Sequence, residues 1–348
     1  MRWRLGSALV GALLLSGVAG CVAVPQTDDP VAPATRTPPA EQLHFTAAGD
    51  YGSTAATSSL LTAVGATRPD LHLALGDLSY GRVGEEQQWC RFVTDRVGTD
   101  LPFQLLPGNH DSDGSNGNIA DFAACLPNRL PGLVGDYPRE YYVDVPSSAP
   151  LVRFVMISPA LTFPDGTWSY AAGSSHLAWT SRAIESARSA GVPWVVVGMH
   201  KPCLSTGVHA CDVGADLLDL LVSERVDLVL SGHEHLYERT AQLAEGPGCA
   251  GVTVGTFTPA CVANSGRDLV AGAGTVFTTV GTGGVALRAP SSSDSEAPYF
   301  EAASGAGSNP THGYVDVRAT PSDLRVSFVR TEGGTFTDSF AITRSAAP

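Results

Sequence analysis

Five short polar motifs constrain this chain more than any other feature, because each contains a glycine and each follows a strand-like run. They are, in chain order, Gly49-Asp50, Gly76-Asp77-Leu78-Ser79-Tyr80, Gly108-Asn109-His110-Asp111, Gly198-Met199-His200 and Gly232-His233-Glu234-His235. In open α/β sheets, ligands bind beyond the carboxyl ends of the strands, where the connecting loops converge. We therefore expect the five motifs to meet at one place.

The apolar runs predict alternating strands and helices up to residue 230. Strands are predicted at 43–48, 71–75, 101–106, 152–157, 194–197 and 226–230, and helices at 53–66, 85–97, 176–190 and 215–224. This alternation is typical of a layered α/β domain. Beyond residue 250 the chain is β-rich, with predicted strands at 275–280, 314–318, 324–329 and 335–342. The stretch 283–311 is rich in Gly, Ser and Pro and is predicted to be a long surface loop.

Taken singly, each motif has an ordinary structural explanation. An aspartate after a glycine is common in turns, where it bonds its own backbone, and a lone histidine is usually a core or surface residue. Together, the motifs supply carboxylate, amide, imidazole and phenol groups, which suit iron, zinc or manganese. Two metal ions about 3.5–4 Å apart need a bridging ligand and about three further ligands each. The motifs supply that number, so the sequence predicts a dinuclear metal centre.

The ordered motifs over residues 50–235 resemble the signature of the calcineurin-like metallophosphoesterases. The block 76–80 is similar to the block of purple acid phosphatases that carries the tyrosinate ligand of ferric iron, and 232–239 resembles their final ligand block. The segments 274–284 and 313–317 also look like that family, so the resemblance covers nearly all of 43–345. It implies an α/β fold of four layers, an αββα sandwich in which helices flank two mixed β-sheets.

Carried over position by position, the resemblance implies two sets of metal ligands. The ferric ion would bind to Asp50, Asp77, Tyr80 and His235. A divalent ion (iron, zinc or manganese) would share the bridging carboxylate of Asp77 and take its other ligands from Asn109, His200 and His233.

Two further histidines are expected to act on the substrate. His110 matches the family's non-ligand histidine, which contacts the phosphate and protonates the leaving group. His209, nine residues after His200, matches a substrate-facing histidine at the same offset, with an ordinary surface histidine as the alternative. Lys201 either attracts phosphate or is simply solvated, and structural roles are expected for His44, His72 and His176.

The resemblance implies hydrolysis of phosphate monoesters by a metal-bound hydroxide, with the two cations neutralising the ester oxygens. Phosphodiesterases and nucleotidases use the same kind of centre, and the shared motifs do not separate these activities, because specificity lies in the pocket walls. An alternative of a different class is a non-catalytic lipoprotein that binds metal or phosphate; a purely structural module would leave the five motifs unexplained. His110 argues against the binding role, because binding alone needs no proton donor.

The charge of the chain limits its partners. With 21 Lys+Arg against 34 Asp+Glu, the formal net charge is -13. Such a field argues against nucleic acid or an anionic membrane surface as the main partner. It also repels phosphate, so local cations must attract the substrate, and bound metal ions are the obvious candidates. The oligomeric state stays open.

The N-terminus predicts export. Residues 1–20 combine two arginines, an apolar run and a small-residue junction, the pattern of a secretory signal. The junction 18–21 resembles a bacterial lipobox, so Cys21 is expected to carry lipid, with an ordinary signal and an incidental cysteine as the alternative. A Pro-rich tether is predicted at 21–42 and the catalytic domain at 43–345. The protein would then be extracytoplasmic and anchored to the cell membrane by its lipid.

The six cysteines after Cys21 form no C-x-x-C pair, which argues against a thiolate zinc site. An even number in an exported chain predicts three disulfides, although six cysteines allow 15 connectivities. Pairing between sequence neighbours is expected, as 90–125, 203–211 and 249–261.

Overall fold

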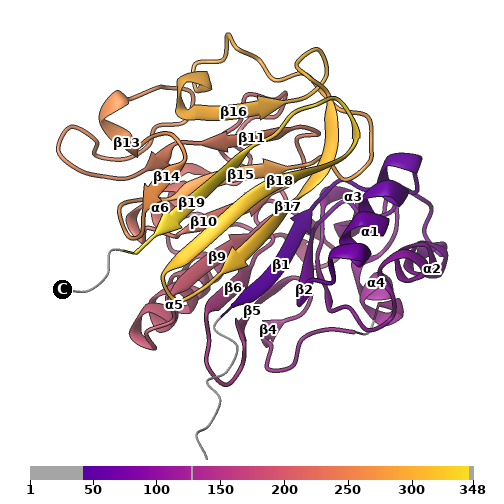
Figure 1. Ribbon diagram of the computed structural model, residues 1–348. Helices are drawn as coiled ribbons and strands as arrows, with labels where there is room; N and C mark the ends of the chain where they lie inside the picture. The colour runs from indigo at the N-terminus through magenta and orange to yellow at the C-terminus, as the bar shows by residue number, and fades with distance from the viewer. Residues whose placement is uncertain (1–41, 127, 345–348) are drawn as a thin grey trace, which may run out of the picture. The chain divides into compact units, whose positions relative to one another are not determined.

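Two large β-sheets lie face to face in the computed structural model, which describes residues 42–126 and 128–344 (Figure 1). The first sheet contains, in spatial order, β14 (Asp268–Val270), β19 (Ser339–Thr343), β18 (Asp323–Gly333), β17 (Thr311–Ala319), β1 (Leu43–Ala48), β2 (Leu71–Leu75) and β3 (Phe103–Leu106). The second contains β16 (Phe300–Ser304), β11 (Tyr237–Thr240), β15 (Val276–Val280), β10 (Leu228–Ser231), β9 (Trp194–Gly198), β6 (Val152–Met156), β5 (Glu140–Val145) and β4 (Val134–Asp136). Two small hairpins pair β7 (Thr162–Phe163) with β8 (Gly166–Thr167) and β12 (Gln242–Leu243) with β13 (Val262–Asn264).

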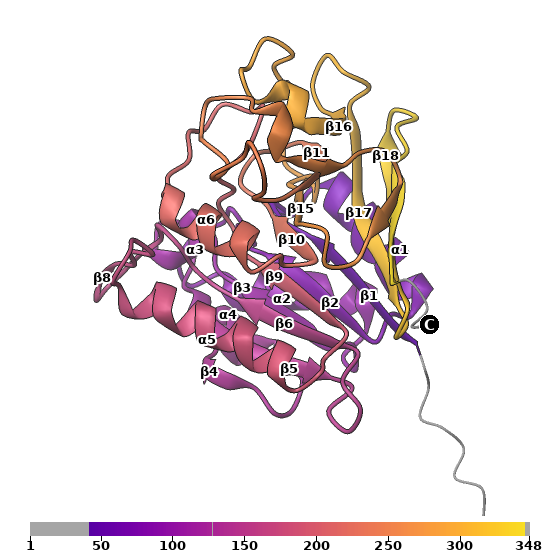
Figure 2. The ribbon, with the colours of Figure 1, turned by 90° about the vertical axis from the view of Figure 1, so that its left-hand side faces the viewer.

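Helices cover the outer face of each sheet (Figures 1 and 2). The first sheet carries α1 (Ala55–Thr67), α2 (Glu86–Val97) and α4 (Ile119–Cys125), and the second carries α5 (Ser175–Ser189) and α6 (Ala215–Ser223). The single turn α3 (Asn109–Ser112) and the 3-10 turns at Pro259–Cys261 and Ala297–Tyr299 lie in connections. The four layers expected from the family resemblance are therefore confirmed.

The sequence of β9 shows why the sheets are buried on both faces. Trp194 and Val196 face the core between the two sheets, whereas Val195 and Val197 face the core under the helices α5 and α6. A strand buried on both faces needs an unbroken apolar run rather than an alternating one. Between the sheets, the rings of Phe45 on β1 and Phe154 on β6 meet edge to face, with centroids 4.9 Å apart.

Strand direction decides where the polar motifs meet. In the first sheet β1, β2 and β3 are parallel, and in the second β6, β9, β10 and β15 are parallel. The carboxyl ends of parallel neighbours lie at the same edge of a sheet, so each sheet gathers its own motifs.

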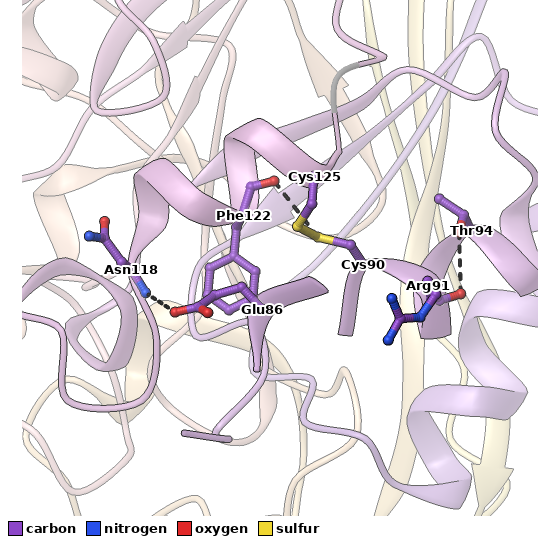
Figure 3. Close-up of a disulfide and its surroundings, with 7 residues drawn as sticks. All are labelled: Glu86, Cys90, Arg91, Thr94, Asn118, Phe122 and Cys125. Carbon is purple, nitrogen blue, oxygen red and sulfur yellow. Dashed lines mark hydrogen bonds between the residues drawn. A yellow bond between two sulfur atoms is a disulfide. The ribbon is translucent and has the colours of Figure 1, made fainter. Parts of the chain in front are cut away.

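The six cysteines pair as expected, as Cys90–Cys125, Cys203–Cys211 and Cys249–Cys261. The first of these bonds joins α2 to α4, as Figure 3 shows. In the same view Glu86, at the start of α2, accepts a hydrogen bond of 3.0 Å from the backbone of Asn118, which precedes α4. The two helices are thus held together at both ends of the contact.

Part of the secondary structure differs from the sequence prediction. The stretch 283–311 is not one surface loop, because it contains a 3-10 turn and β16, an edge strand that pairs with β11. The strand expected at 335–342 begins only at Ser339. Because β16 has only one neighbour in the sheet and a partly exposed pattern, it lacks the apolar run that marks the central strands.

The described residues belong to one compact unit of the chain. None of their helices has the length and apolar character that crossing a membrane requires. The predicted signal at 1–20, the lipidation site Cys21 and nearly all of the predicted tether lie outside the described residues, so they stay predictions.

Candidate metal centre

All five motifs follow the carboxyl ends of parallel strands. Those of the first sheet place Asp50 after β1, Asp77 and Tyr80 after β2, and Asn109 after β3. Those of the second sheet place His200 after β9 and both His233 and His235 after β10. The seven predicted ligands therefore come from both sheets of the sandwich.

The hydroxyl of Tyr80 lies at the centre of the first ligand group. It is 3.1 Å from Oδ1 of Asp50, 2.9 Å from Oδ2 of Asp77 and 3.2 Å from Nε2 of His235. Nε2 of His235 is itself 3.5 Å from Oδ1 of Asp50. The four residues predicted to bind a ferric ion are thus in mutual contact.

The second group forms around His200, whose Nε2 is 3.2 Å from Oδ1 of Asn109 and 3.3 Å from Oδ1 of Asp77. Asp77, His200 and His233 each offer a donor atom, and these atoms lie within 4.8 Å of one another. Asp77 therefore directs one carboxylate oxygen toward each group, the arrangement that a bridging ligand requires.

Surrounding groups fix the orientation of the donors. Nδ1 of His200 donates to the carbonyl of Leu75 at 2.8 Å, which leaves Nε2 as the atom that faces the other donors. Oδ2 of Asp50 accepts the backbone N–H of His233 at 2.8 Å. Such outer contacts set the tautomer and direction of metal-binding side chains.

Asp111 holds two of the motif loops together. Its fully buried carboxylate accepts backbone N–H groups from Leu78 and Gly108, each at 3.1 Å. Gly108 also permits close approach, because a Cβ at this position would lie 2.0 Å from Oδ1 of Asp77. The sequence placed Asp111 inside a motif but gave it no role.

Four of the seven predicted ligands occupy the left-handed backbone region. The φ angles are 63° for Asp50, 52° for Asp77, 51° for Tyr80 and 68° for His233. Non-glycine residues adopt this region at a cost, and such positions cluster at functional sites. The surrounding structure keeps these side chains directed at one another.

The site concentrates negative charge in a buried volume. Burial, followed by the charge of Asp77, raises the pKa of Asp50 to about 7 even though His200 opposes the shift. Burial also opposes the charged form of His200, yet the carboxylate of Asp77 raises the pKa of this imidazole to about 9. Burial and the two carboxylates raise the pKa of the Tyr80 phenol far above its ordinary value. A phenolate here would need a strong cation beside it.

These residues fit metal ions. Nε2 of His233 is buried and has no hydrogen-bond partner among the described residues. Burial lowers the pKa of this ring to about 2, so the imidazole is neutral, the form that binds metals. The site thus combines an unpaired imidazole nitrogen, a buried carboxylate and further oxygen atoms. Iron, zinc and manganese bind to ligands of these kinds.

His110 lies at the rim of the centre, with its side chain 35% exposed. Its Nδ1 donates to Oδ1 of Asn116 at 2.6 Å, and its Nε2 is 3.8 Å from Oδ2 of Asp77. Its ring also lies against Tyr80, with centroids 4.5 Å apart. The sequence gave no sign of Asn116, which orients this histidine.

His209 also lies beside the centre, on an exposed loop. Its ring packs against that of His233, with centroids 4.1 Å apart. Its Nε2 is 2.7 Å from Nη1 of Arg288. Because a guanidinium can only donate, Nε2 of His209 is the acceptor. Arg288 belongs to no motif, and sequence reasoning missed it.

The other conspicuous histidines and the lysine have partners elsewhere. The described contacts pair His44 with Asp316 at 2.7 Å, His176 with Glu140 at 3.0 Å and Lys201 with Asp212 at 2.9 Å. His72 is buried and both ring nitrogens are hydrogen-bonded, to Thr46 and Tyr51 at 2.7 Å each.

The sequence and the fold of this chain resemble those of known proteins. The family model described as calcineurin-like phosphoesterase matches residues 43–237. Purple acid phosphatase 18 of Arabidopsis thaliana is 26% identical over 220 residues, which is 61% of this chain and 48% of that protein. An uncharacterised protein of Mycobacterium tuberculosis is 30% identical over 232 residues, which is 62% of this chain and 42% of that protein. The chain thus spans about half the length of these curated relatives.

A solved structure supports the fold. The purple acid phosphatase PPD1 of yellow lupin (Lupinus luteus) aligns with 87% of this chain and 54% of its own, with a TM-score of 0.65 and 18% identity. At that identity the likeness establishes the arrangement of layers and strands only.

Proposed function

Since the chain belongs to the calcineurin-like phosphoesterase family, we propose that it is an exported hydrolase of phosphate monoesters similar to the purple acid phosphatases. One observation supports this most: Asp77 directs an oxygen toward each of two contiguous groups of metal donors. A binding protein for a single ion needs only one such group.

The proposed ligands form two groups, one for each cation. Asp50, Asp77, Tyr80 and His235 would hold a ferric ion. Asn109, His200 and His233, with Asp77 shared, would hold a divalent iron, zinc or manganese ion. Bound there, the ions would neutralise the ester oxygens and activate water for attack.

His110 supplies the proton that the leaving group needs. The hydrogen bond from Nδ1 to Asn116 fixes the ring, so that Nε2 is the atom turned toward the centre. Protonated at both nitrogens, the ring can donate from Nε2 to the departing alkoxide oxygen. In His110→Asn, alkyl phosphates should therefore slow more than aryl phosphates with good leaving groups; equal slowing would remove the acid role.

The test of the function compares an aryl phosphate monoester with the matching diester, from acid to mildly alkaline pH, using the full chain and Asp77→Ala. Monoester turnover that Asp77→Ala abolishes supports the proposal. A preference for the diester would place the protein among phosphodiesterases. Two bound metal ions without turnover of either ester would favour the non-catalytic binding role.

The identity of the first metal ion has its own test. A Tyr80 phenolate on ferric iron absorbs visible light by charge transfer. Tyr80→Phe should lose that absorption while both metal ions stay bound. An unchanged spectrum would remove the Tyr80–iron bond from the proposal.

Export and anchoring form the second part of the proposal. Three disulfides within the described residues suit an oxidising compartment, and the predicted lipobox supplies the anchor at Cys21. Expressed in a bacterium, the full chain should fractionate with membranes and Cys21→Ala should not. Equal membrane binding of the two proteins would exclude lipidation.

A further inference from the structure

Arg288 lies against the metal centre, and its backbone is fixed on both sides. Its N–H donates to the carbonyl of His235 at 2.8 Å, and its own carbonyl accepts the N–H of Ala306 at 2.8 Å. The first of these bonds attaches Arg288 directly to a proposed metal ligand. These two bonds fix the position of the Arg288 backbone beside the candidate centre.

The guanidinium of Arg288 contacts the ring of His209, which itself packs against the ring of His233. Nη1 lies 2.7 Å from Nε2 of His209 and 3.3 Å from the carbonyl of His233. These contacts use Nη1 only: from Nε and Nη2 no hydrogen bond reaches another residue of the described chain. The side chain is 34% exposed. The guanidinium therefore has unused donors on a partly exposed side chain, close to His233 of the second ligand group.

Glu234 balances this positive charge without occupying those donors. It is fully buried between the two ligands His233 and His235, and its Oε2 lies 3.8 Å from Nη1 of Arg288. Within the described ranges Oε2 makes no hydrogen bond, whereas Oε1 accepts the backbone N–H of His209. Glu234 thus contacts both His209 and Arg288.

The loop that carries His209 is built to lie on Glu234. The disulfide Cys203–Cys211 closes this loop between two cysteines that are 8 positions apart in the sequence. A Cβ at Gly207 would lie 2.2 Å from the carboxyl carbon of Glu234, so only glycine permits the approach. The loop, the buried carboxylate and the guanidinium therefore form one fixed arrangement beside the centre.

We propose that Arg288 binds the phosphate group of the substrate and thereby favours monoester dianions over diesters. Glu234 is its positioning residue. This inference rests on the proposed function. The planar guanidinium offers two parallel N–H donors, which match two oxygens of one phosphate. A monoester dianion carries one more charge than a diester and has three terminal oxygens rather than two. Arg288 also supplies, from the protein itself, a local positive charge in a chain of net charge -13.

The test uses the full chain loaded with metal, in the variants Arg288→Gln and Arg288→Lys. Calorimetry measures the Kd of inorganic phosphate, and steady-state kinetics measure KM and kcat for an aryl monoester and its diester. The matched control is Arg325→Gln, because Arg325 is 65% exposed and, among the described residues, forms an ion pair only with Asp323. Metal content is determined for every variant.

We expect Arg288→Gln to weaken phosphate binding by about tenfold to 100-fold, the effect of losing charge-assisted hydrogen bonds. The KM for the monoester should rise in parallel and the KM for the diester should rise less, with metal content unchanged. Arg288→Lys should recover part of the affinity, because it keeps the charge but not the planar fork. Arg325→Gln should match the wild type.

Glu234→Gln tests the positioning role. It keeps an amide oxygen for the N–H of His209 but removes the charge beside Arg288. Phosphate binding should weaken in the wild-type background and should not weaken further in Arg288→Gln. Equal losses in both backgrounds would assign Glu234 a purely structural role and overturn this part of the proposal.

The outcomes separate this inference from the proposed function. Phosphate affinity and monoester KM in Arg288→Gln within about twofold of the wild type overturn the role of Arg288, even in an active phosphatase. Arg288-dependent phosphate binding in a protein that hydrolyses no ester overturns the enzyme and leaves the phosphate site supported. A wild-type protein that binds no phosphate overturns the role of Arg288.

Discussion

Two buried polar clusters connect the sheets of this protein, and they differ in how completely their charges are paired. One is the candidate metal centre. The other, here called the Asp338 cluster, joins Tyr237 and Arg239 of β11 to Asp338, which precedes β19 in the opposite sheet. Arg239 donates to the two carboxylate oxygens of Asp338 at 2.7 and 3.2 Å, and Tyr237 donates to one of them at 2.8 Å.

In the Asp338 cluster one cation faces one anion, both side chains are 2% exposed, and the donors match the acceptors. At the metal centre the single hydroxyl proton of Tyr80 faces both Asp50 and Asp77, and an imidazole nitrogen of His233 has no partner within the described structure. Buried polar groups are costly unless they are paired. The comparison indicates that the charges and hydrogen bonds of the Asp338 cluster are balanced by the protein alone. Those of the candidate metal centre would be balanced only by bound cations.

The largest expected effect is on the Asp338 cluster. Asp338→Ala leaves Arg239 buried without its anion, which should lower the free energy of unfolding by about 3–5 kcal/mol. Denaturant titration measures the loss, and Asp323→Ala, which breaks an exposed pair, should cost less than about 1 kcal/mol. Similar small losses in both variants would show that the cluster is not a structural pair.

The centre should respond in the opposite way. Asp50→Asn removes one of two neighbouring buried carboxylates, so the metal-free protein should be at least as stable as the wild type in denaturant titration. Activity should fall by at least about 100-fold, since even outer-sphere partners of metal ligands cost 10–100-fold. Metal content should fall as well. If metal-free Asp50→Asn loses as much stability as Asp338→Ala, the centre is a structural cluster.

His72 offers a third case, a buried histidine whose partners are neutral. Burial lowers its pKa from 6.5 to about 3, so the folded state binds a proton less readily than the unfolded state. The contribution of the neutral His72 ring to the free energy of unfolding is therefore fully present above pH 6.5. It is lost as the pH falls from 6.5 toward 3, by about 1.4 kcal/mol per pH unit. Between pH 6.5 and 5 this amounts to roughly 2 kcal/mol.

His72→Gln isolates this contribution. The variant should be less stable at neutral pH, because Thr46 loses the imidazole acceptor, but it should show a shallower decline in acid. Denaturant midpoints at several pH values measure both slopes. Parallel slopes for the two proteins would mean that another group causes the acid sensitivity.

The smallest effect is expected at Lys201, which follows a proposed metal ligand but pairs with Asp212. In Lys201→Gln the KM for a monoester should change by less than about threefold, because the lost charge is already neutralised and an exposed partner contributes about 1 kcal/mol or less. Steady-state kinetics beside Arg288→Gln provide the contrast. A larger rise than in Arg288→Gln would make Lys201 the phosphate ligand.

Much of the central sheet structure could be predicted because its signal is local. The strands expected at 43–48 and 71–75 have those bounds in the structure, since unbroken apolar runs mark them. By contrast, β11 reads Tyr-Glu-Arg-Thr and gives no such signal. Its charged residues are buried only because Asp338 and the loop around residue 206 provide partners from distant parts of the chain.

The candidate site shows the same limit. The seven predicted ligands lie together, and each of them belongs to a short sequence motif. Their roles as metal ligands stay predictions. Arg288 could not be found in this way, because it meets His209 across 79 residues of sequence. Asn116 likewise matters only through the orientation of the His110 ring. Short motifs identify the candidate ligands and the candidate acid. The residues that orient them can be identified only from the folded structure.

Because the centre takes its donors from both sheets, the thickness of the core between them sets how far apart the donors stand. The contact between Phe45 and Phe154 is part of that spacer. Close-packed interiors pass on even the change of one methylene group, and metal sites tolerate displacements of only about 0.5 Å. At the proposed metal centre, residues that never touch a cation would thus help to decide which cation fits, and the hydrophobic core would contribute to metal preference.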